Sequence, residues 1–327
     1  MYSWGPDTSG WAKPGGYKFD SARAPYLDKL AKDASAKGPR SYSRAKTWNA
    51  ALVDPKGKEI STDSSNPLVV AIDVTGSMAS WPGEIFDRLP LMYQTLSQYK
   101  PDVEIAFCAI GDATCDSYPL QVNNFGKGVE LEDHVKALCA EGGGGGQVSE
   151  SYELFGHFAN TKIKMPNAKS PFLLVYGDEK FYNQIAAAQV KHYMGDTLNS
   201  DLDSESMWKG VLGKFNLFFM HKPYGYGGEA NVDREVVDHW AAVIGRQRII
   251  ELPSYERAVD VGIGLIAKQW GEFGDFGSSL SSRQIDPNVR ASVYHSLRHI
   301  ADPSATNSVM DRSASKKSIP LDKLVEN

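Results

Sequence analysis

The stretch PLVVAIDVTGSMASW, residues 67 to 81, places one acid and two hydroxyl side chains directly after a run of apolar residues. These three residues, Asp73, Thr75 and Ser77, alternate along the chain, so a turn that follows a buried strand can direct them into one small space. Carboxylate and hydroxyl oxygens are hard ligands, which suit Mg²⁺ or Mn²⁺ better than Zn²⁺. The motif therefore predicts a divalent cation site at the end of a strand.

The same residue types also cap helices and form turns, because their side-chain oxygens accept hydrogen bonds from free backbone N–H groups. An isolated Asp-x-Thr-x-Ser is more often a cap or a turn than a metal site. Three features favour the metal site here: the strand before the motif, the run of five glycines at residues 142–146 and the later sequence YGD.

Five apolar runs look like strands buried on both faces, and they cover residues 67–73, 103–112, 171–178, 215–224 and 247–253. Segments of helical period cover residues 84–99, 130–140, 149–161, 180–194, 233–244 and 256–270. This alternation predicts an α/β fold, with a Rossmann-like doubly wound and mainly parallel sheet covered by helices on both faces. Residues 118–125 closely follow the second run and predict one antiparallel edge strand.

Acids stand at the carboxyl ends of three of these strands, at Asp73, Asp112 and Asp178. Ligands of open α/β sheets bind beyond the carboxyl ends of the strands, so we expect these acids to converge on one rim of the sheet. Asp112, together with Asp116, is interpreted first as a turn-forming acid. His221 ends another strand at the same rim, where a lone histidine is more often structural than catalytic.

The segments before and after the alternating region differ from it in composition and in the structure that they predict. Residues 1–40 are rich in Gly, Pro and aromatic residues and predict an extended arm. Residues 41–66 contain the turn sequence DPKG and predict a β-hairpin on the edge of the sheet. Residues 273–302 predict a C-terminal helical extension, and residues 303–327 predict a flexible tail. The acidic stretch 196–209 is expected to be a solvated loop or a helix cap.

Composition limits the classes of function. The 327 residues, 42% of them hydrophobic and 23% charged, can bury a large core. The net charge of −5 provides no general attraction to phosphate backbones, so no nucleic-acid partner is expected. No stretch approaches the roughly 20 apolar residues of a membrane span, and no secretory signal is visible, so we expect a cytoplasmic protein with no membrane partner. The three cysteines lack metal-type spacing and predict reduced structural thiols.

The motif and its surroundings resemble the von Willebrand factor A (vWA) domain, whose metal-ion-dependent adhesion site (MIDAS) has the pattern Asp-x-Ser/Thr-x-Ser. The resemblance covers residues 67–272 and rests on AIDVTGSM, on EGGGGGQVSESYELF as a second loop and on LLVYGDEK as a third. It implies that Asp73, Thr75 and Ser77 are metal ligands from the first loop. It also implies that Asp178 supplies the last acid.

The second loop departs from the family pattern. The family places a Thr or Asp there, whereas this chain has Gln147 after the glycines, with Ser149 and Ser151 as alternatives. The amide oxygen of a glutamine can still serve as a ligand, so Gln147 completes the predicted metal set.

The ligand set predicts binding rather than catalysis. If hydroxyls bind the ion directly while the acids act through water, the ion remains a strong Lewis acid that favours an incoming carboxylate, and an Asp or Glu of a partner protein would complete its shell. Intracellular relatives of the vWA type often work beside MoxR-like AAA+ ATPases, so the resemblance implies an adaptor for such a partner. A structural subunit with metal-independent interfaces is the alternative.

A phosphatase is the least favoured reading, and we expect no enzyme. Haloacid-dehalogenase-type phosphatases need a second acid two residues after the first, and this chain has Thr75 at that position.

Overall fold

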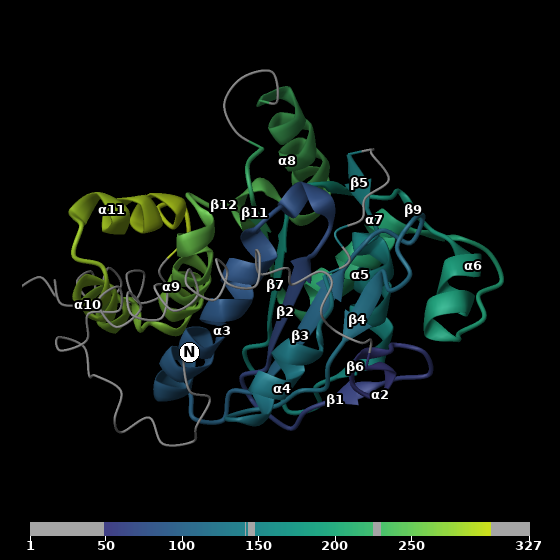
Figure 1. Ribbon diagram of the computed structural model, residues 1–327, viewed down its shortest axis with the longest axis horizontal. Coiled ribbons are helices and arrows are strands. Elements are labelled where there is room, and N and C mark those ends of the chain that lie inside the picture. Colours follow the sequence, from purple (N-terminus) through teal and green to yellow (C-terminus); the bar gives the residue numbers. More distant parts are fainter. Residues whose placement is uncertain (1–48, 141, 143–147, 225–229, 302–327) are drawn as a thin grey trace, which may run out of the picture.

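The computed structural model describes residues 49–140, 142, 148–224 and 230–301. Figure 1 shows a central sheet with helices on both sides. The predicted arm, residues 1–40, and the predicted tail, residues 303–327, lie outside the described residues.

The central sheet has six strands in the order β12-β11-β7-β2-β3-β4. Neighbouring strands are parallel, except for the antiparallel pair of β3 and β4. The mainly parallel α/β sheet predicted from the sequence is therefore confirmed, and β4 falls inside the predicted edge segment. The bounds are β2 Leu68–Asp73, β3 Ile105–Ile110, β4 Leu120–Val122, β7 Phe172–Gly177, β11 Asn216–His221 and β12 Ile249–Glu251.

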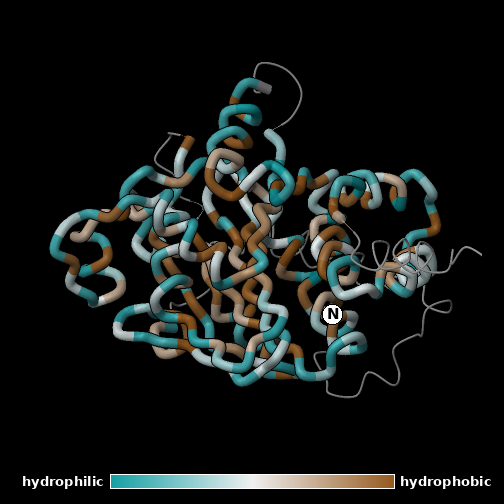
Figure 2. The backbone as a smooth tube through the Cα atoms, turned by 180° about the vertical axis from the view of Figure 1, so that it is seen from behind, coloured by the Kyte–Doolittle hydropathy of each residue, from teal (hydrophilic) through white to brown (hydrophobic). Residues whose placement is uncertain are grey.

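The sheet separates two apolar cores, and alternate residues of β2 face each of them. Leu68, Val70 and Ile72 belong to the first core, whereas Val69 and Ala71 belong to the second. All six residues of β2 are buried, which explains why the strand reads as one apolar run. In Figure 2 the hydrophobic stretches of the backbone gather in the middle of the molecule, along these strands.

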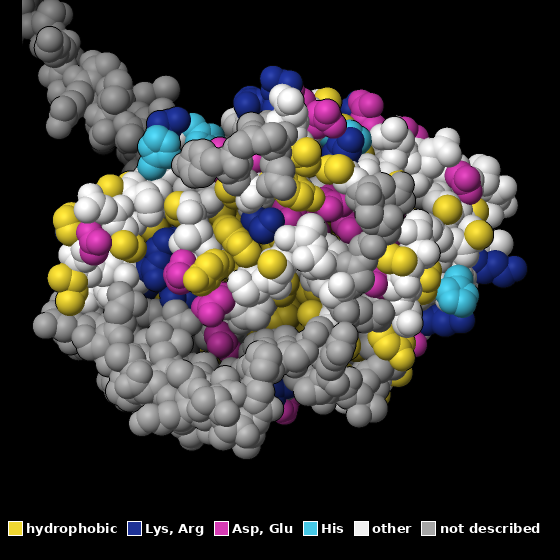
Figure 3. Space-filling view, turned by 45° about the horizontal axis from the view of Figure 1, so that its top comes forward, with side chains coloured by type: hydrophobic (Ala, Val, Ile, Leu, Met, Phe, Trp, Pro, Cys, Tyr) yellow, Lys and Arg dark blue, Asp and Glu magenta, His cyan; other side chains and the backbone are white. Residues whose placement is uncertain are grey.

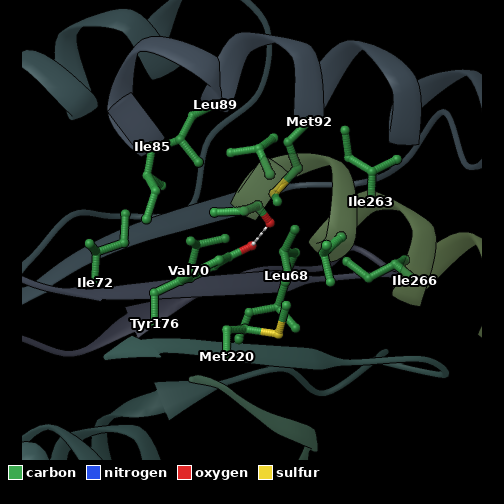
Figure 4. Close-up of a cluster of buried hydrophobic side chains, with 14 of the residues drawn as sticks. Leu68, Val70, Ile72, Ile85, Leu89, Met92, Tyr176, Met220, Ile263 and Ile266 are labelled. Carbon is green, nitrogen blue, oxygen red and sulfur yellow. Dashed lines mark hydrogen bonds between the residues drawn. The ribbon is translucent and has the colours of Figure 1, made fainter. Parts of the chain in front are cut away.

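Helices cover both cores. The first core packs against α3 Trp81–Tyr99, α4 Glu130–Ala137, α9 Ala258–Trp270, α10 Phe273–Arg283 and α11 Pro287–Ser296. The second packs against α5 Tyr152–Lys162, α7 Ser204–Lys214 and α8 Ala230–Ile244. Figure 4 shows side chains of α3 and α9 meeting those of the strands in the first core. There the Tyr176 hydroxyl donates a hydrogen bond of 3.3 Å to the carbonyl oxygen of Ala258, where α9 begins.

The predicted C-terminal extension shares the first core with the rest of the chain, because Phe276, Leu280 and Val293 lie in the same cluster as the strands. A buried ion pair also joins α10 to α9. The Asp260 carboxylate accepts hydrogen bonds from Arg257 at 3.0 Å and from Arg283 at 2.6 Å.

Three short strand pairs and several single turns lie outside the central sheet. The pairs are β1 Ile60–Ser61 with β6 Ile163–Lys164, β5 Ser149–Glu150 with β8 Lys180–Phe181, and β9 Gln184–Ile185 with β10 Leu202–Asp203. The helical turns are α2 Ala50–Val53, η1 Gly76–Met78, α6 Ala187–Gln189, η2 Val190–Met194, η3 Arg246–Arg248 and η4 Tyr255–Arg257.

The predicted hairpin in residues 41–66 is wrong for its described part. The turn is present, since the Lys58 amide donates to the Pro55 carbonyl at 3.0 Å. Its flanks do not pair with each other: the residues before it form α2, whose Val53 enters the first core, and β1 pairs in parallel with β6. Tertiary pairing and core burial thus override the local alternation.

The helix predicted over residues 180–194 is wrong in its first half. This half contains β8 and β9, which bury Phe181 and Ile185 in the second core. The Tyr182 amide also donates to the Glu153 carboxylate at 3.0 Å, which holds the backbone extended. The helix cap predicted in the acidic stretch 196–209 is present, since Asp203 accepts a hydrogen bond from the Ser206 amide at the start of α7. The helix α7 itself was not predicted from the sequence.

None of the three cysteines, all of which lie in the described residues, is in a disulfide; Cys108 and Cys139 are buried and Cys115 is exposed. Burial raises the pKa of the Cys108 thiol to about 12. Within the described part of the chain, every helix is too short or too polar to cross a bilayer.

Candidate functional site

The carboxyl ends of β2, β3 and β7 lie next to one another at one rim of the sheet. Asp73 is the last residue of β2, and Asp112 and Asp178 follow shortly after β3 and β7. In the register, Asp73 pairs with Ile110 and Ile72 pairs with Tyr176. The sheet therefore brings the strand-end acids to one edge, as the sequence predicts.

The side chains of Asp73, Thr75, Ser77 and Asp178 form a chain of hydrogen bonds. The Thr75 hydroxyl donates to Asp73 Oδ1 at 2.6 Å and lies 3.2 Å from the Ser77 hydroxyl. The Ser77 hydroxyl donates to Asp178 Oδ1 at 3.0 Å, across 101 positions of the sequence. Four of the five predicted metal ligands are thus brought together.

Two further side chains bond to the two ends of this series of hydrogen bonds. The Tyr152 hydroxyl donates to Asp73 Oδ2, and the Lys222 ammonium donates to Asp178 Oδ2 at 2.8 Å. We call the six side chains, Tyr152, Asp73, Thr75, Ser77, Asp178 and Lys222, the rim network. Asp73 and Asp178 are fully buried and Lys222 is only 8% exposed, so water screens the network poorly.

The side chains of the turn after β2 make two kinds of hydrogen bond, one to the backbone and the others to side chains. Thr75 stands at the N-cap of η1, but its side chain makes no capping hydrogen bond. The Thr75 amide instead donates to Asp73 Oδ1 at 2.8 Å, which is a turn contact of an acid with the backbone. Asp73 therefore forms the turn contact that was the alternative to a metal site. The hydroxyls of Thr75 and Ser77 instead donate to carboxylates.

The predicted ligand from the second loop, Gln147, is outside the described residues. Its two alternatives point elsewhere: the Ser149 hydroxyl donates to the Val148 carbonyl at 2.8 Å, and the Ser151 hydroxyl accepts from the Ala113 amide at 2.9 Å. Neither serine has a hydrogen bond to the rim network among those of the described residues.

Acids surround the rim network. Seven buried carboxyl groups lie around these strand ends, belonging to Asp73, Asp112, Asp116, Glu150, Glu153, Asp178 and Glu179. Figure 3 shows acidic side chains beside a Lys or Arg side chain near the middle of this face of the molecule. Lys222 neutralises one of these acids through its ion pair with Asp178.

Burial changes the protonation of these groups. Burial, and next the neighbouring Asp178, raises the pKa of Asp73, while hydrogen bonds from Thr75 and Tyr152 act in the opposite direction. Burial also raises the pKa of Glu150 to about 10 and that of Glu153 to about 8. Without a further cation, the site therefore holds protons that a carboxyl group in water would lose.

The donors of the rim fit a hard divalent cation in type. Two hydroxyls and two carboxylates are oxygen ligands, and Glu150 Oε2 is buried without a hydrogen-bond partner among the described residues. In that same part of the chain, no three His, Cys, Asp or Glu side chains are arranged to hold a metal ion by themselves. A cation here would depend on the hydroxyls, as the predicted ligand set requires.

Tyr152, Lys222 and Glu150 are members of the site that the sequence reading did not include. Gly177, in the sequence YGD, makes room for Tyr152, because a Cβ atom at this glycine would overlap with the Tyr152 hydroxyl. The glycine is therefore needed for the phenol to reach Asp73. Lys222 directly follows His221 and carried no signal of its own.

The weaker candidates have structural contacts. Asp112 accepts hydrogen bonds from the Thr114 amide and hydroxyl at 3.0 and 2.5 Å, and Asp116 accepts from the Asp112 amide at 2.8 Å. These are turn contacts, as expected for this pair. His221 stacks on Phe219 with ring centres 5.9 Å apart and is not part of the rim network.

Raising the pH should destabilise the cation-free protein. Glu150 and Glu153 have a higher pKa in the fold than in the unfolded chain, so their stabilising protons are fully present below the unfolded pKa and are lost as the pH rises through the folded pKa. Thermal unfolding in EDTA should show a midpoint that falls between about pH 6 and about pH 9. Glu150→Gln should flatten this fall, whereas the surface variant Glu132→Gln should keep it. An equal slope in Glu150→Gln would contradict this account of the site.

A methyl group at Gly177 should push Tyr152 away from Asp73. Gly177→Ala should lower the free energy of unfolding by about 1–3 kcal/mol, measured by urea denaturation. Tyr152→Phe removes the closest atom, so the same glycine change should cost less in that background. Gly213→Ala is the matched control, because a Cβ atom there meets nothing within 4 Å, and it should not destabilise the protein. Equal costs of Gly177→Ala in both backgrounds would refute the proposed contact.

Comparison with known proteins yields structural likeness only. No protein-family model and no curated protein matches the chain. Solved structures that align with it include two forms of the pilus adhesin SpaC from Lactobacillus rhamnosus GG, 11% and 8% identical with TM-scores of 0.46 and 0.45, over 65% and 68% of this chain and 31% of the adhesin. Proximal thread matrix protein 1 from the mussel byssus is 9% identical with a TM-score of 0.43, over 63% of this chain and 48% of that protein. The chain thus spans less than half the length of each of these proteins.

Proposed function

We propose that the chain is a cytoplasmic protein-interaction module of the vWA type, which binds an acidic side chain of a partner protein through Mg²⁺ or Mn²⁺ at the rim. The observation that carries this proposal is the order of the rim network: the hydroxyls of Thr75 and Ser77 lie between the carboxylates of Asp73 and Asp178. This order matches the ligand set that the resemblance implies. Gln147 is the fifth proposed ligand.

The charge of the rim supports a cation. Carboxylates are costly to bury unless a positive charge or hydrogen bonds compensate them. Glu150 retains a buried oxygen without a hydrogen bond among the described residues, and its pKa is raised to about 10. A divalent cation nearby would lower the cost of ionising this group and its neighbours.

The neutral hydroxyls bear on what the site would bind. Hydroxyl ligands do not neutralise a bound Mg²⁺, which would then attract an Asp or Glu of a partner. The roles of the chain's own residues follow: Thr75 and Ser77 would bind the ion, Asp73 would orient Thr75, and Asp178 would orient Ser77. Tyr152 holds Asp73 from the opposite side.

Binding fits these residues better than turnover. A nucleophilic Asp73 would need a proton-transfer acid two residues later, and that position is Thr75, whose hydroxyl donates to Asp73 itself. We therefore propose an adaptor rather than an enzyme. On the resemblance alone, a MoxR-like AAA+ ATPase is the proposed partner.

One contact favours a second candidate, a structural subunit whose interfaces need no metal. The Lys222 ammonium already donates to Asp178 at 2.8 Å and supplies a permanent positive charge to the rim. In that case the rim network would be a structural element of the fold, and the surfaces that join the subunits would lie elsewhere.

Removing the Thr75 hydroxyl should abolish cation binding. Thr75→Val keeps the shape of the side chain but lacks the oxygen, so calorimetric titration of the full chain with MnCl₂ should lose its binding heat. Thr75→Ser keeps the hydroxyl and is the matched control. Capture of partner proteins by the immobilised chain should likewise depend on Mg²⁺, be lost in EDTA and be lost in Thr75→Val. Absence of Mn²⁺ binding in the wild type, or equal binding in Thr75→Val, would eliminate the metal-dependent function.

Replacing Lys222 separates the two candidates. If the rim binds a cation, Lys222→Gln removes a repelling charge and should tighten Mn²⁺ binding by about tenfold or more. If Lys222 is instead the permanent cation of a structural network, the variant should lose about 3–5 kcal/mol of unfolding free energy and still bind no Mn²⁺. Lys209→Gln, at an exposed i,i+4 pair with Glu205, is the control for loss of one positive charge.

A further inference from the structure

A cavity lies at the edge of the sheet, around strand β12. Its volume is about 630 Å³, and its walls come from α8, η3, β12 and α11. Small-molecule sites in proteins usually have volumes of about 300–1,000 Å³. None of the six residues of the rim network lines it. The cavity is therefore separate from the proposed cation site.

Basic and imidazole side chains line this cavity. Arg246, Arg298, His295 and His299 come from η3 and from the end of α11 and the residues after it. In Figure 3, histidine side chains gather with a Lys or Arg side chain at one edge of the molecule. Guanidinium and imidazole N–H groups are the donors that proteins use for carboxylate and phosphate oxygens.

The two arginines differ in their partners. Arg246 forms an exposed ion pair with Asp238 at 3.0 Å. Arg298 lies 3.2 Å from the ring nitrogen Nδ1 of His295, and no carboxylate pairs with it among the described residues. One acid, Glu251, also lines the cavity, and its side chain is exposed. Arg298 is therefore the cation that remains available to an anion.

His221 gives the cavity a buried polar wall. It is 2% exposed, and neither ring nitrogen has a hydrogen-bond partner among the described residues. Its Nε2 lies 3.5 Å from Asp233 Oδ1, an oxygen that already accepts a hydrogen bond from the Tyr224 amide at 2.8 Å. Burial lowers the pKa of His221 to about 4, so the ring is neutral and carries one N–H donor. Stacking on Phe219 fixes its orientation.

The rest of the lining includes apolar side chains, two serines and the amide side chain of Gln247. Val237, Ile249 and Pro253 provide apolar surface. The Ser296 hydroxyl is used by the backbone, since it donates to the Glu251 carbonyl at 2.7 Å. A ligand would thus meet cationic and imidazole donors together with an apolar surface.

From these observations we infer that the cavity between α8, β12 and α11 binds a small organic oxyanion, a carboxylate or a phosphate on an apolar body. Arg298 pairs with the anionic group, the ring of His221 forms a buried wall of the site, and Val237 and Ile249 contact the apolar body. The inference does not depend on the proposed cation site, because no residue of that site takes part.

Titration of the full chain in EDTA with three probes tests the inference. Phenyl phosphate and benzoate carry the two oxyanions on the same ring, and benzamide is the neutral analogue. We expect saturable binding of phenyl phosphate, benzoate or both in calorimetry, and none of benzamide. The stronger of the two probes identifies which anionic group the site prefers.

Two variants and one control locate the binding. Arg298→Gln should weaken it by about tenfold or more, because a charge-assisted hydrogen bond is lost. His221→Phe should weaken it too, while keeping an aromatic ring on Phe219. Arg234→Gln changes an exposed arginine of α8 that bonds to Asn231, and binding should be unaffected. Since Arg298 is exposed, its loss should leave the fold intact. Failure of both anions to bind, or equal binding by Arg298→Gln, would overturn the inference.

Discussion

Buried negative charge at the carboxyl ends of β2, β3 and β7 is the constraint on which the arrangement of the rim depends. Parallel strands end side by side, so an acid at each end must share one small region with the others. The hydroxyls of Thr75, Ser77 and Tyr152 and the ammonium of Lys222 compensate part of that charge. Glu150 is left with a buried oxygen that the described residues do not satisfy. One functional candidate adds a bound ion to this compensation, whereas in the other Lys222 is the only cation considered and Glu150 and Glu153 keep their protons.

Small residues at the strand ends make the arrangement sterically possible. Gly177 gives room to the Tyr152 hydroxyl, and at Gly111 an added Cβ atom would lie 2.5 Å from Asp116 Oδ2. Each glycine stands directly before a strand-end acid, at Asp178 and Asp112. The side chain or turn that packs against the acid can therefore approach the backbone closely. The chemistry of the rim and the packing of its backbone are thus encoded by the same short sequences, VYGD and AIGD.

The parts that the sequence predicted are those with strong local signals. The five parallel strands are fully or largely buried, so each appears as an apolar run, and Asp73, Thr75 and Ser77 lie within one turn. Partners from distant segments were missed, because Lys222 meets Asp178 across 44 positions and Tyr152 meets Asp73 across 79. The failures at residues 41–66 and 180–194 have the same cause. There, short extended segments pair with distant strands or bury one aromatic ring. Neither the pairing nor the burial can be predicted from the local hydrophobic periodicity.

The distribution of the three thiols has a practical consequence. Cys108 and Cys139 are enclosed by the fold, while Cys115 is exposed on the turn after β3, with its sulfur 3.8 Å from Asp112 Oδ2. A maleimide dye added to the folded chain would therefore meet Cys115 before the two buried thiols, without any prior cysteine removal. That position borders the acidic rim, so the dye's emission would respond to changes in local charge there. The native sequence thus already contains the attachment point for an optical sensor of its own rim.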